Sequence, residues 1–154
     1  MRDVRKNYNI FFDGRGYAGL SEDFNAPKLA LKTEDWMGGG MFADVELTMG
    51  MEKLNADFSL LCVDPDILSR FSVVEGAWVP ITAREALDSI DGTVKPLIHT
   101  MRGKVKEIDP GTSKPGTKAT TKVTLSLIYY KLTHGTRVVQ EIDLVNMVVK
   151  QNGV

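Results

Sequence analysis

The chain has little cysteine, no long apolar run and no signal-like start. Cys62 is the only cysteine among 154 residues, which excludes an internal disulfide and a thiolate metal cluster and is typical of a reducing compartment. Its apolar flank, Leu60 to Val63, predicts a small buried side chain rather than a nucleophile. The charged start over residues 1–6 has no apolar stretch after it, and no run approaches the ~20 apolar residues that span a bilayer. We therefore expect no signal peptide and no stable membrane association.

Net charge is almost absent as well. The 19 basic and 20 acidic residues give a formal net charge of -1, so no global attraction to nucleic acid or to an anionic membrane is expected. A hydrophobic content of 43% over 154 residues is enough for one domain with its own core. The composition therefore predicts a single domain over residues 1–154.

Patterns that carry catalysis or cofactor binding are weak. Gly14 to Gly19 matches the glycine fingerprint of dinucleotide folds, but that motif needs a helix to open at its glycines, and Pro27 and an irregular stretch follow instead. His99 and His134 have no serine elbow or metal-ligand spacing nearby, so we expect both to be structural or exposed. The sequence predicts no enzyme activity, no cofactor and no metal site.

Alternation of apolar and polar residues with a period of two dominates the chain and predicts β-strands. One short helix is expected from the N-cap Asp64 and from Pro65, ending by Gly76. The pattern predicts a mostly β fold, an antiparallel β-sandwich or barrel with one short α-helix. The clearest strand covers 121–130, with Val123, Leu125, Leu127 and Tyr129 on one face. Further strands are expected over 8–12, 17–20, 44–49, 54–60, 79–90, 138–142 and 144–149, with an Asp13-Gly14 turn after the first.

A glycine-rich segment from Lys32 to Ala43 differs from an ordinary hairpin loop. Large apolar side chains on so flexible a backbone lose much entropy when they become ordered, so they should be buried against something. Two interpretations stay open: a loop folded onto its own core, or an arm that packs on a neighbouring subunit. The residues of this candidate arm are Trp36, Met37, Gly38, Gly39, Gly40, Met41 and Phe42.

A second segment, from Arg102 to Lys118, carries five cations and two anions, an excess of three positive charges. Most such runs beside Pro-Gly turns are solvated hairpins. Nucleic-acid binding is a weaker interpretation, because no aromatic residue is interleaved to stack on bases. The cations are Arg102, Lys104, Lys106, Lys114 and Lys118.

Three blocks of the sequence, in order, resemble the major tail tube protein of contractile-tailed bacteriophages and of R-type tailocins. They run from Pro27 through Glu34 to Met41, from Gly50 through Phe58 to Leu60, and from Met101 through Tyr129-Tyr130 to Asp143. The resemblance spans nearly the whole chain. It implies a structural subunit that stacks as hexameric rings, in which each protomer contributes strands to one inter-subunit β-barrel.

The resemblance also implies a function and partners. The tube would form a channel for DNA passage and would penetrate the cell envelope when the sheath contracts. Its partners would be further copies of itself, the sheath protein, the tape measure protein, and baseplate and tail terminator proteins, with DNA only as passing cargo. The expected location is the virion tail, assembled in the cytoplasm of the host bacterium.

Site residues follow from the same resemblance. The glycine-rich arm should reach across subunits, although Trp36-Met37 stands where the family has an aromatic followed by a basic residue. The basic segment should set stacking register by pairing with acidic positions of the next ring. A lumen should not attract a passing polymer, which makes the polar face bearing Thr124 and Ser126 a candidate. The acidic positions considered for stacking are Glu85, Asp88 and Asp91.

Two alternatives remain open from the sequence. One is the tube of a tailocin or secretion-type injection system that carries no DNA, and the other, from a different class, is a small β-barrel ligand-binding protein. Members of the family usually continue past Asn152 to Val154 with a short charged segment. We therefore expect this form to be folded and monomeric, or at most ring-forming, at micromolar concentration.

Overall fold

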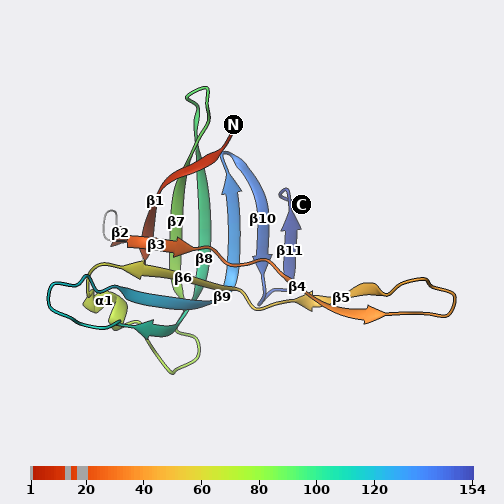
Figure 1. Cartoon of the computed structure of the whole chain (residues 1–154), viewed down its shortest axis with the longest axis horizontal. Coiled ribbons are helices and arrows are strands. Elements are labelled where there is room, and N and C mark those ends of the chain that lie inside the picture. Colours follow the sequence, from red (N-terminus) through yellow and green to blue (C-terminus); the bar gives the residue numbers. More distant parts are fainter. Residues whose placement is uncertain (1, 13–14, 17–20) are drawn as a thin grey trace.

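The computed structural model describes residues 2–12, 15–16 and 21–154, which form a strongly bent antiparallel β structure with one short helix (Figure 1). The predicted fold class is confirmed. The predicted barrel between subunits involves several chains, so it stays a prediction. The elements are β1 (Val4–Phe12), β2 (Arg15–Gly16), β3 (Ser21–Asn25), β4 (Leu31–Trp36), β5 (Val45–Met51), β6 (Asn55–Leu60), α1 (Pro65–Leu68), β7 (Val79–Asp88), β8 (Val94–Asp109), β9 (Thr121–His134), β10 (Arg137–Asp143) and β11 (Val148–Gln151).

The strands form two layers. Strands β8 and β9 are long and bent, so that one part of each belongs to the first layer and the other part to the second. The main layer has the order β11-β10-β9-β8-β7-β1-β2, and the covering layer adds β6 and β3 to the first part of β9. Residues 121–126 of β9 pair with β6, whereas residues 129–134 pair with β10. In Figure 1, β3 and β6 cross the upright strands of the main layer. This is the arrangement of a sandwich whose corner is made by strands that change layers.

A β-bulge marks the corner. Arg102 pairs with Tyr129, and the next residue, Gly103, pairs with Leu127, so Ile128 has no partner in β8. A Cβ on Gly103 would collide with the Ser126 carbonyl and lie 2.9 Å from the Cα of Leu127. Only glycine lets the two backbones approach this closely, so the bend depends on it.

The hydrophobic core lies between the two layers. The rings of Phe12 and Phe58, from β1 and β6, meet with centroids 6.1 Å apart. The predicted core face of β9 is confirmed for Val123, Leu125 and Leu127 but is wrong for Tyr129. The extra bulge residue shifts the alternation by one, so Tyr130 is buried instead. The remaining fully buried large side chains include Ile10, Leu54, Leu60, Ile67, Ile81 and Met101.

Several predicted boundaries need correction. The Asp64 carboxylate caps α1 by accepting the Asp66 N–H at 2.8 Å, but the helix ends at Leu68 rather than near Gly76. Residues 69–78 include exposed apolar side chains and offer no buried face that would stabilise further turns.

The last strand begins at Val148, not 144, because the Asp143 carboxylate accepts the N–H groups of Val145 and Asn146 and closes a turn. Strands β3 and β4 were not predicted, and of β8 only the part from Arg102 was expected, as one side of a hairpin. The expected Asp13-Gly14 turn and the expected strand over 17–20 lie outside the described residues.

Candidate assembly surfaces

The glycine-rich segment forms the outer end of a long arm. Strands β4 and β5 pair only with each other, and Figure 1 shows this hairpin leaving one end of the molecule along its longest axis. Every residue of β4, and all of β5 except Met51, is exposed. The segment therefore does not fold onto its own core, and its first part, from Lys32 to Trp36, is strand.

Aromatic and sulfur side chains gather at the outer end of the arm. Trp36 ends β4 with 54% of its surface exposed, and its ring lies against Gly38, where a Cβ would come within 2.7 Å of the indole. The Met41 N–H donates to the Gly38 carbonyl at 3.2 Å, whereas Met37 is exposed and Phe42 is fully exposed. A two-stranded hairpin that is exposed to solvent on both faces is only marginally stable by itself, so we expect this arm to pack against another protein surface.

The structure separates the five cations of the basic segment. Arg102 lies in the middle of β8, on the face of the main layer that the covering layer leaves open. Lys104 forms an ion pair of 2.8 Å with Glu75, and Lys118 contacts Glu22. Lys106 and Lys114 form no ion pair with any other described residue. Of the five cations of the segment, Lys106 and Lys114 are the two beside the 110–120 loop that form no ion pair with a described residue.

The acidic positions considered for stacking are mostly occupied within the chain. Glu85 is wrong as a surface contact, since only 9% of it is exposed and it points into the core. Asp88 pairs with Lys6 at 2.9 Å, and this hydrogen bond lowers the pKa of Asp88. The Asp91 carboxylate accepts the Thr93 N–H at 3.0 Å, which lowers the pKa of Asp91.

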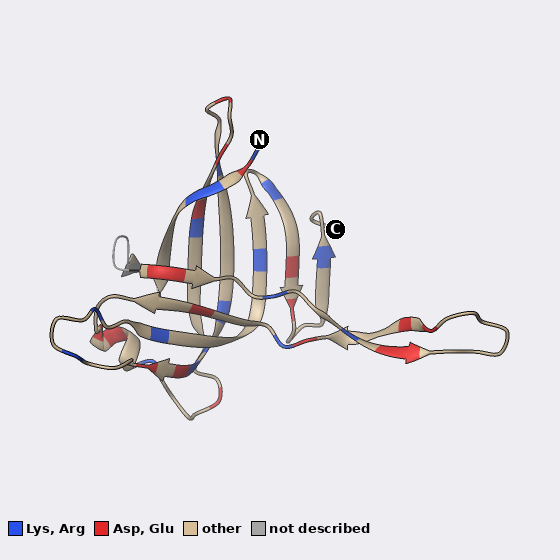
Figure 2. Cartoon of the chain, viewed as in Figure 1, with Lys and Arg blue, Asp and Glu red and all other residues tan. Residues whose placement is uncertain are grey.

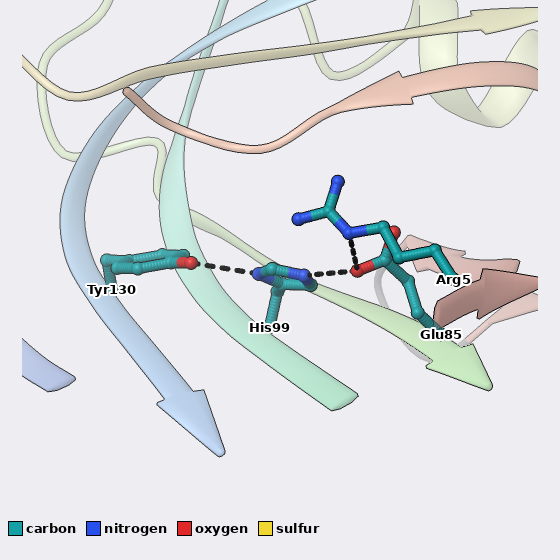
Figure 3. A network of polar contacts seen from close by, with 4 residues as sticks. All are labelled: Arg5, Glu85, His99 and Tyr130. Carbon is teal, nitrogen blue, oxygen red and sulfur yellow. Dashed lines mark hydrogen bonds and ion pairs between the residues drawn. The ribbon is translucent and has the colours of Figure 1, made fainter. Parts of the chain in front are cut away.

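Glu85 belongs to a polar network inside the sandwich (Figure 3). His99, which is 2% exposed, lies 2.8 Å from Glu85 through Nε2 and 2.8 Å from the Tyr130 hydroxyl through Nδ1. A carboxylate only accepts, so Nε2 of His99 donates to Glu85, while Nδ1 lies within hydrogen-bond distance of the Tyr130 hydroxyl. Burial, followed by the charge of Glu85, raises the pKa of Tyr130 to about 12, which keeps this hydroxyl a donor. Arg5, at 3.7 Å, balances Glu85 from β1.

This network was not predicted from the sequence, although the positions of Glu85 and His99 within their strands indicate it. Glu85 occupies the apolar phase of β7, between Ala83 and Leu87, and His99 occupies the apolar phase of β8, between Leu97 and Met101. A charged and an ionisable residue at core positions of adjacent strands indicates a buried pair. The structural interpretation of His99 holds, while His134 lies half-exposed at the end of β9, 3.3 Å from Asp3.

Among the residues that the structure describes, the main layer is covered on one face only. Across its open face the register aligns Thr82, Thr100, Lys131 and Glu141 in one row, followed by Lys150 of β11. The adjacent row aligns Arg102 with Tyr129 and Asp143. Tyr129 donates its hydroxyl to Glu141 at 3.0 Å. This face is therefore polar and mixed in charge.

Thr124 and Ser126 lie in the other layer. They are half-buried on the side of β9 away from the core, opposite Asp57 and Asn55 of β6. The two edges of the main layer are β11 and the β1–β2 side, and β1 pairs with β2 only through Phe11 and Phe12. Within the described residues, both edges retain unpaired backbone groups that another strand could use.

Within residues 2–12, 15–16 and 21–154, no group of three or more His, Cys, Asp or Glu side chains is placed to hold a metal ion. No helix in these ranges has the length and hydropathy needed to cross a membrane. The described residues thus offer three kinds of surface that another protein could contact: the arm, the open face of the bent sheet, and the two edges of that sheet.

Sequence comparisons identify relatives of matching length. The profile of a family described as phage tail tube protein FII matches residues 3–154. The tail tube protein of Escherichia phage P2 is 32% identical over 153 residues, covering 97% of this chain and 89% of that protein. The major tail tube protein of Serratia phage KSP20 is 29% identical over 148 residues, covering 95% of this chain and 85% of that protein.

Solved structures share the fold. A chain of the sheath-tube complex of the PVC extracellular contractile injection system, in the extended state, superposes with a TM-score of 0.61 at 9% identity, over 82% of this chain and 88% of that chain. A chain of the anti-feeding prophage baseplate gives a TM-score of 0.53 at 12% identity, over 84% and 91%. Taken with the profile match over nearly the whole length, the chain belongs to the phage tail tube protein FII family, a family of structural tail tube subunits and not of enzymes.

Proposed function

We propose that this tail tube subunit assembles by pairing the free edges of its main layer with those of neighbouring copies. The observation that carries the proposal is a sheet that, in the described part of the chain, has two edges with unpaired backbone groups and a covering layer on one face only. Edge-to-edge pairing removes both edges at once when the ring closes. Six copies would then form one continuous barrel, and rings would stack into a tube.

The position of the covering layer supports one choice of the face that lines the lumen. Strands β3 and β6 occupy one side of the main layer, so in a closed barrel they lie outside and the open face lies inside. We therefore propose that the lumen is lined by the face bearing Thr100, Lys131 and Glu141 rather than by the face bearing Thr124 and Ser126. Lys131 and Glu141 are direct cross-strand neighbours, which limits attraction of the wall to a passing polyanion.

The arm supplies the second contact. Its hairpin buries none of its outer apolar side chains in its own chain, and an interface that covers Trp36 and Phe42 would remove them from water. We assign the arm to a neighbouring copy, as the exposed strands β4 and β5 favour.

Partners and cargo follow from the relatives. The solved chains of similar fold come from a sheath-tube complex and a baseplate, which supports association with sheath and baseplate proteins. The named relatives are tail tube proteins of two phages, which supports DNA passage after a tape measure protein leaves, with a terminator at the distal end. A tailocin-type tube without DNA would use the same contacts and differ in cargo.

The test is microscopy of the purified chain with an edge variant. The Asn152 N–H donates to the Val139 carbonyl, so alternation places the N–H of Val149 outward at the free edge of β11. Val149→Pro removes this donor without removing a bond to β10. The parent should form six-fold rings or tubes, and Val149→Pro should stay folded but not close rings. A parent that stays monomeric at high concentration, or rings of Val149→Pro equal to the parent's, would overturn the proposal.

A further inference from the structure

Acidic side chains dominate the arm without compensation. Between Leu31 and Met51 the anions are Glu34, Asp35, Asp44 and Glu46, against one cation, Lys32. None of the four anions forms an ion pair within the part of the chain that the structure describes. Figure 2 shows only acidic colouring along the outer part of the arm.

Two of these anions face each other. Asp35 of β4 pairs directly with Glu46 of β5 in the register of the hairpin. Like charges directly opposite each other destabilise an antiparallel pair, and here no core packing offsets the repulsion. The neighbouring cross-strand pair, Trp36 and Val45, is apolar and exposed. Successive residues of a strand point to opposite faces, so the outer arm presents the acidic pair on one face and the apolar pair on the other. A groove that receives the arm should therefore offer apolar side chains and a cation.

Such a surface exists at the opposite end of the same molecule. A groove of about 420 Å³ between α1 and the end of β8 is lined by Leu68, Phe71, Lys106, Glu107, Ile108 and Pro110. Half of the Phe71 surface is exposed there. Lys106, which lines the groove, forms no ion pair with a described residue, and neither does Lys114, which lies on the loop that follows Pro110 but outside the groove lining. Figure 1 places α1 and this loop at the end of the long axis away from the arm.

We propose that the arm of one copy docks into the α1–β8 groove of a neighbouring copy, with Asp35 and Glu46 facing Lys106 and Lys114. The proposal rests on the self-assembly proposed above and names the partner surface of the arm. The contact is heterologous, because the arm and the groove are different surfaces at opposite ends, so each copy gives one arm and receives another. Glu107 is the unfavourable member of the groove, because it would face the arm's anions.

Charge reversal on either side tests the contact. Asp35→Lys with Glu46→Lys, or Lys106→Glu with Lys114→Glu, should raise the protein concentration needed for half-assembly about tenfold or more, and added salt should partly relieve the effect. Glu107→Gln should lower that concentration. Lys28→Glu with Lys53→Glu is the matched control, since both lysines are exposed between strands and far from the groove in sequence.

Mixing the two reversed variants gives the sharpest result. Each variant alone opposes like charges at every junction, but a 1:1 mixture can alternate so that every arm meets a groove of opposite charge. Assembly should therefore return in the mixture, as seen by sedimentation velocity and negative-stain microscopy. Assembly of each reversed variant at the parent's concentration, or no recovery in the mixture, would overturn the docking proposal while leaving the tube function intact. A parent that never assembles would instead overturn the function.

Discussion

The ring of Phe24 lies beside the imidazole of His99, with centroids 5.6 Å apart. Phe24 comes from β3 of the covering layer and His99 from β8 of the main layer, so this contact closes the sandwich over the polar network. Glu85, His99 and Tyr130 are thereby kept from water on the side where the layers meet. Their hydrogen bonds to one another are then the main compensation for burying a charge.

Replacing His99 should therefore destabilise the monomer. His99→Leu leaves the buried Glu85 carboxylate without its strongest partner, and we expect a loss of about 3–5 kcal/mol in the free energy of unfolding, measured by urea denaturation. The double variant Glu85→Leu with His99→Leu should be less destabilised than the single one. A single variant as stable as the parent would show that Glu85 is satisfied without His99.

Alkaline pH should weaken the fold through Tyr130. Its pKa is raised to about 12 in the folded state, above the ordinary value near 10 of an unfolded chain, so the folded state holds the proton that the unfolded state releases. The contribution of the protonated Tyr130 hydroxyl to the free energy of unfolding is fully present below about pH 10. It falls by roughly 1.4 kcal/mol per pH unit as the pH rises from there toward the pKa of the folded state. Urea midpoints measured from pH 8 to 11 should show this fall. Tyr130→Phe should flatten it.

The corner of the bent sheet offers a backbone test. Gly103→Ala should cost about 2–3 kcal/mol, because a Cβ there meets the backbone of Ser126 and Leu127. The matched control is Gly39→Ala, where no atom lies within 4 Å of the added Cβ and the change should stay within about 0.5 kcal/mol. Equal thermal midpoints for the two variants would contradict the close approach of β8 and β9.

Removing the aromatic groups of the arm should separate folding from assembly. Trp36→Ala with Phe42→Ala removes side chains that touch no core, so the urea midpoint of the monomer should match the parent while polymerisation is lost. Val73→Ala, which trims another exposed apolar residue, serves as the control. Unfolding of the double variant would place the arm in the subunit's own core, and normal tubes would remove it from the interface.

Alternation identified most strands that have one buried face. The strands over 79–88 and 121–127 could be predicted because their apolar residues face a core at every second position. Strands β3 and β4 could not, since β4 is exposed on both faces and β3 is mostly polar. Their residues show no apolar period, and only pairing with a partner strand makes them extended.

The surfaces were harder to predict than the fold. Glycines around the arm's apolar residues indicate an unusual segment, but the sequence alone does not tell whether this segment folds onto the core. The structure shows that β4 and β5 extend away from it as a separate hairpin. The spacing of the lysines suggested one basic hairpin, but the length of β8 places Arg102 on the open face of the main layer and Lys114 on a distant loop. Which charges meet depends on strand length and bending, which local sequence does not encode.

The bend at Gly103 has a mechanical consequence. Because β8 and β9 run without interruption through both layers, the part of the subunit that holds the arm and the part that would close the ring are joined by peptide bonds as well as by packing. A push delivered to one layer travels to the other along two continuous backbones, and the layers cannot shear apart without breaking the hydrogen-bond ladder between them. We therefore expect the two layers to move as a single body under a load along the tube axis.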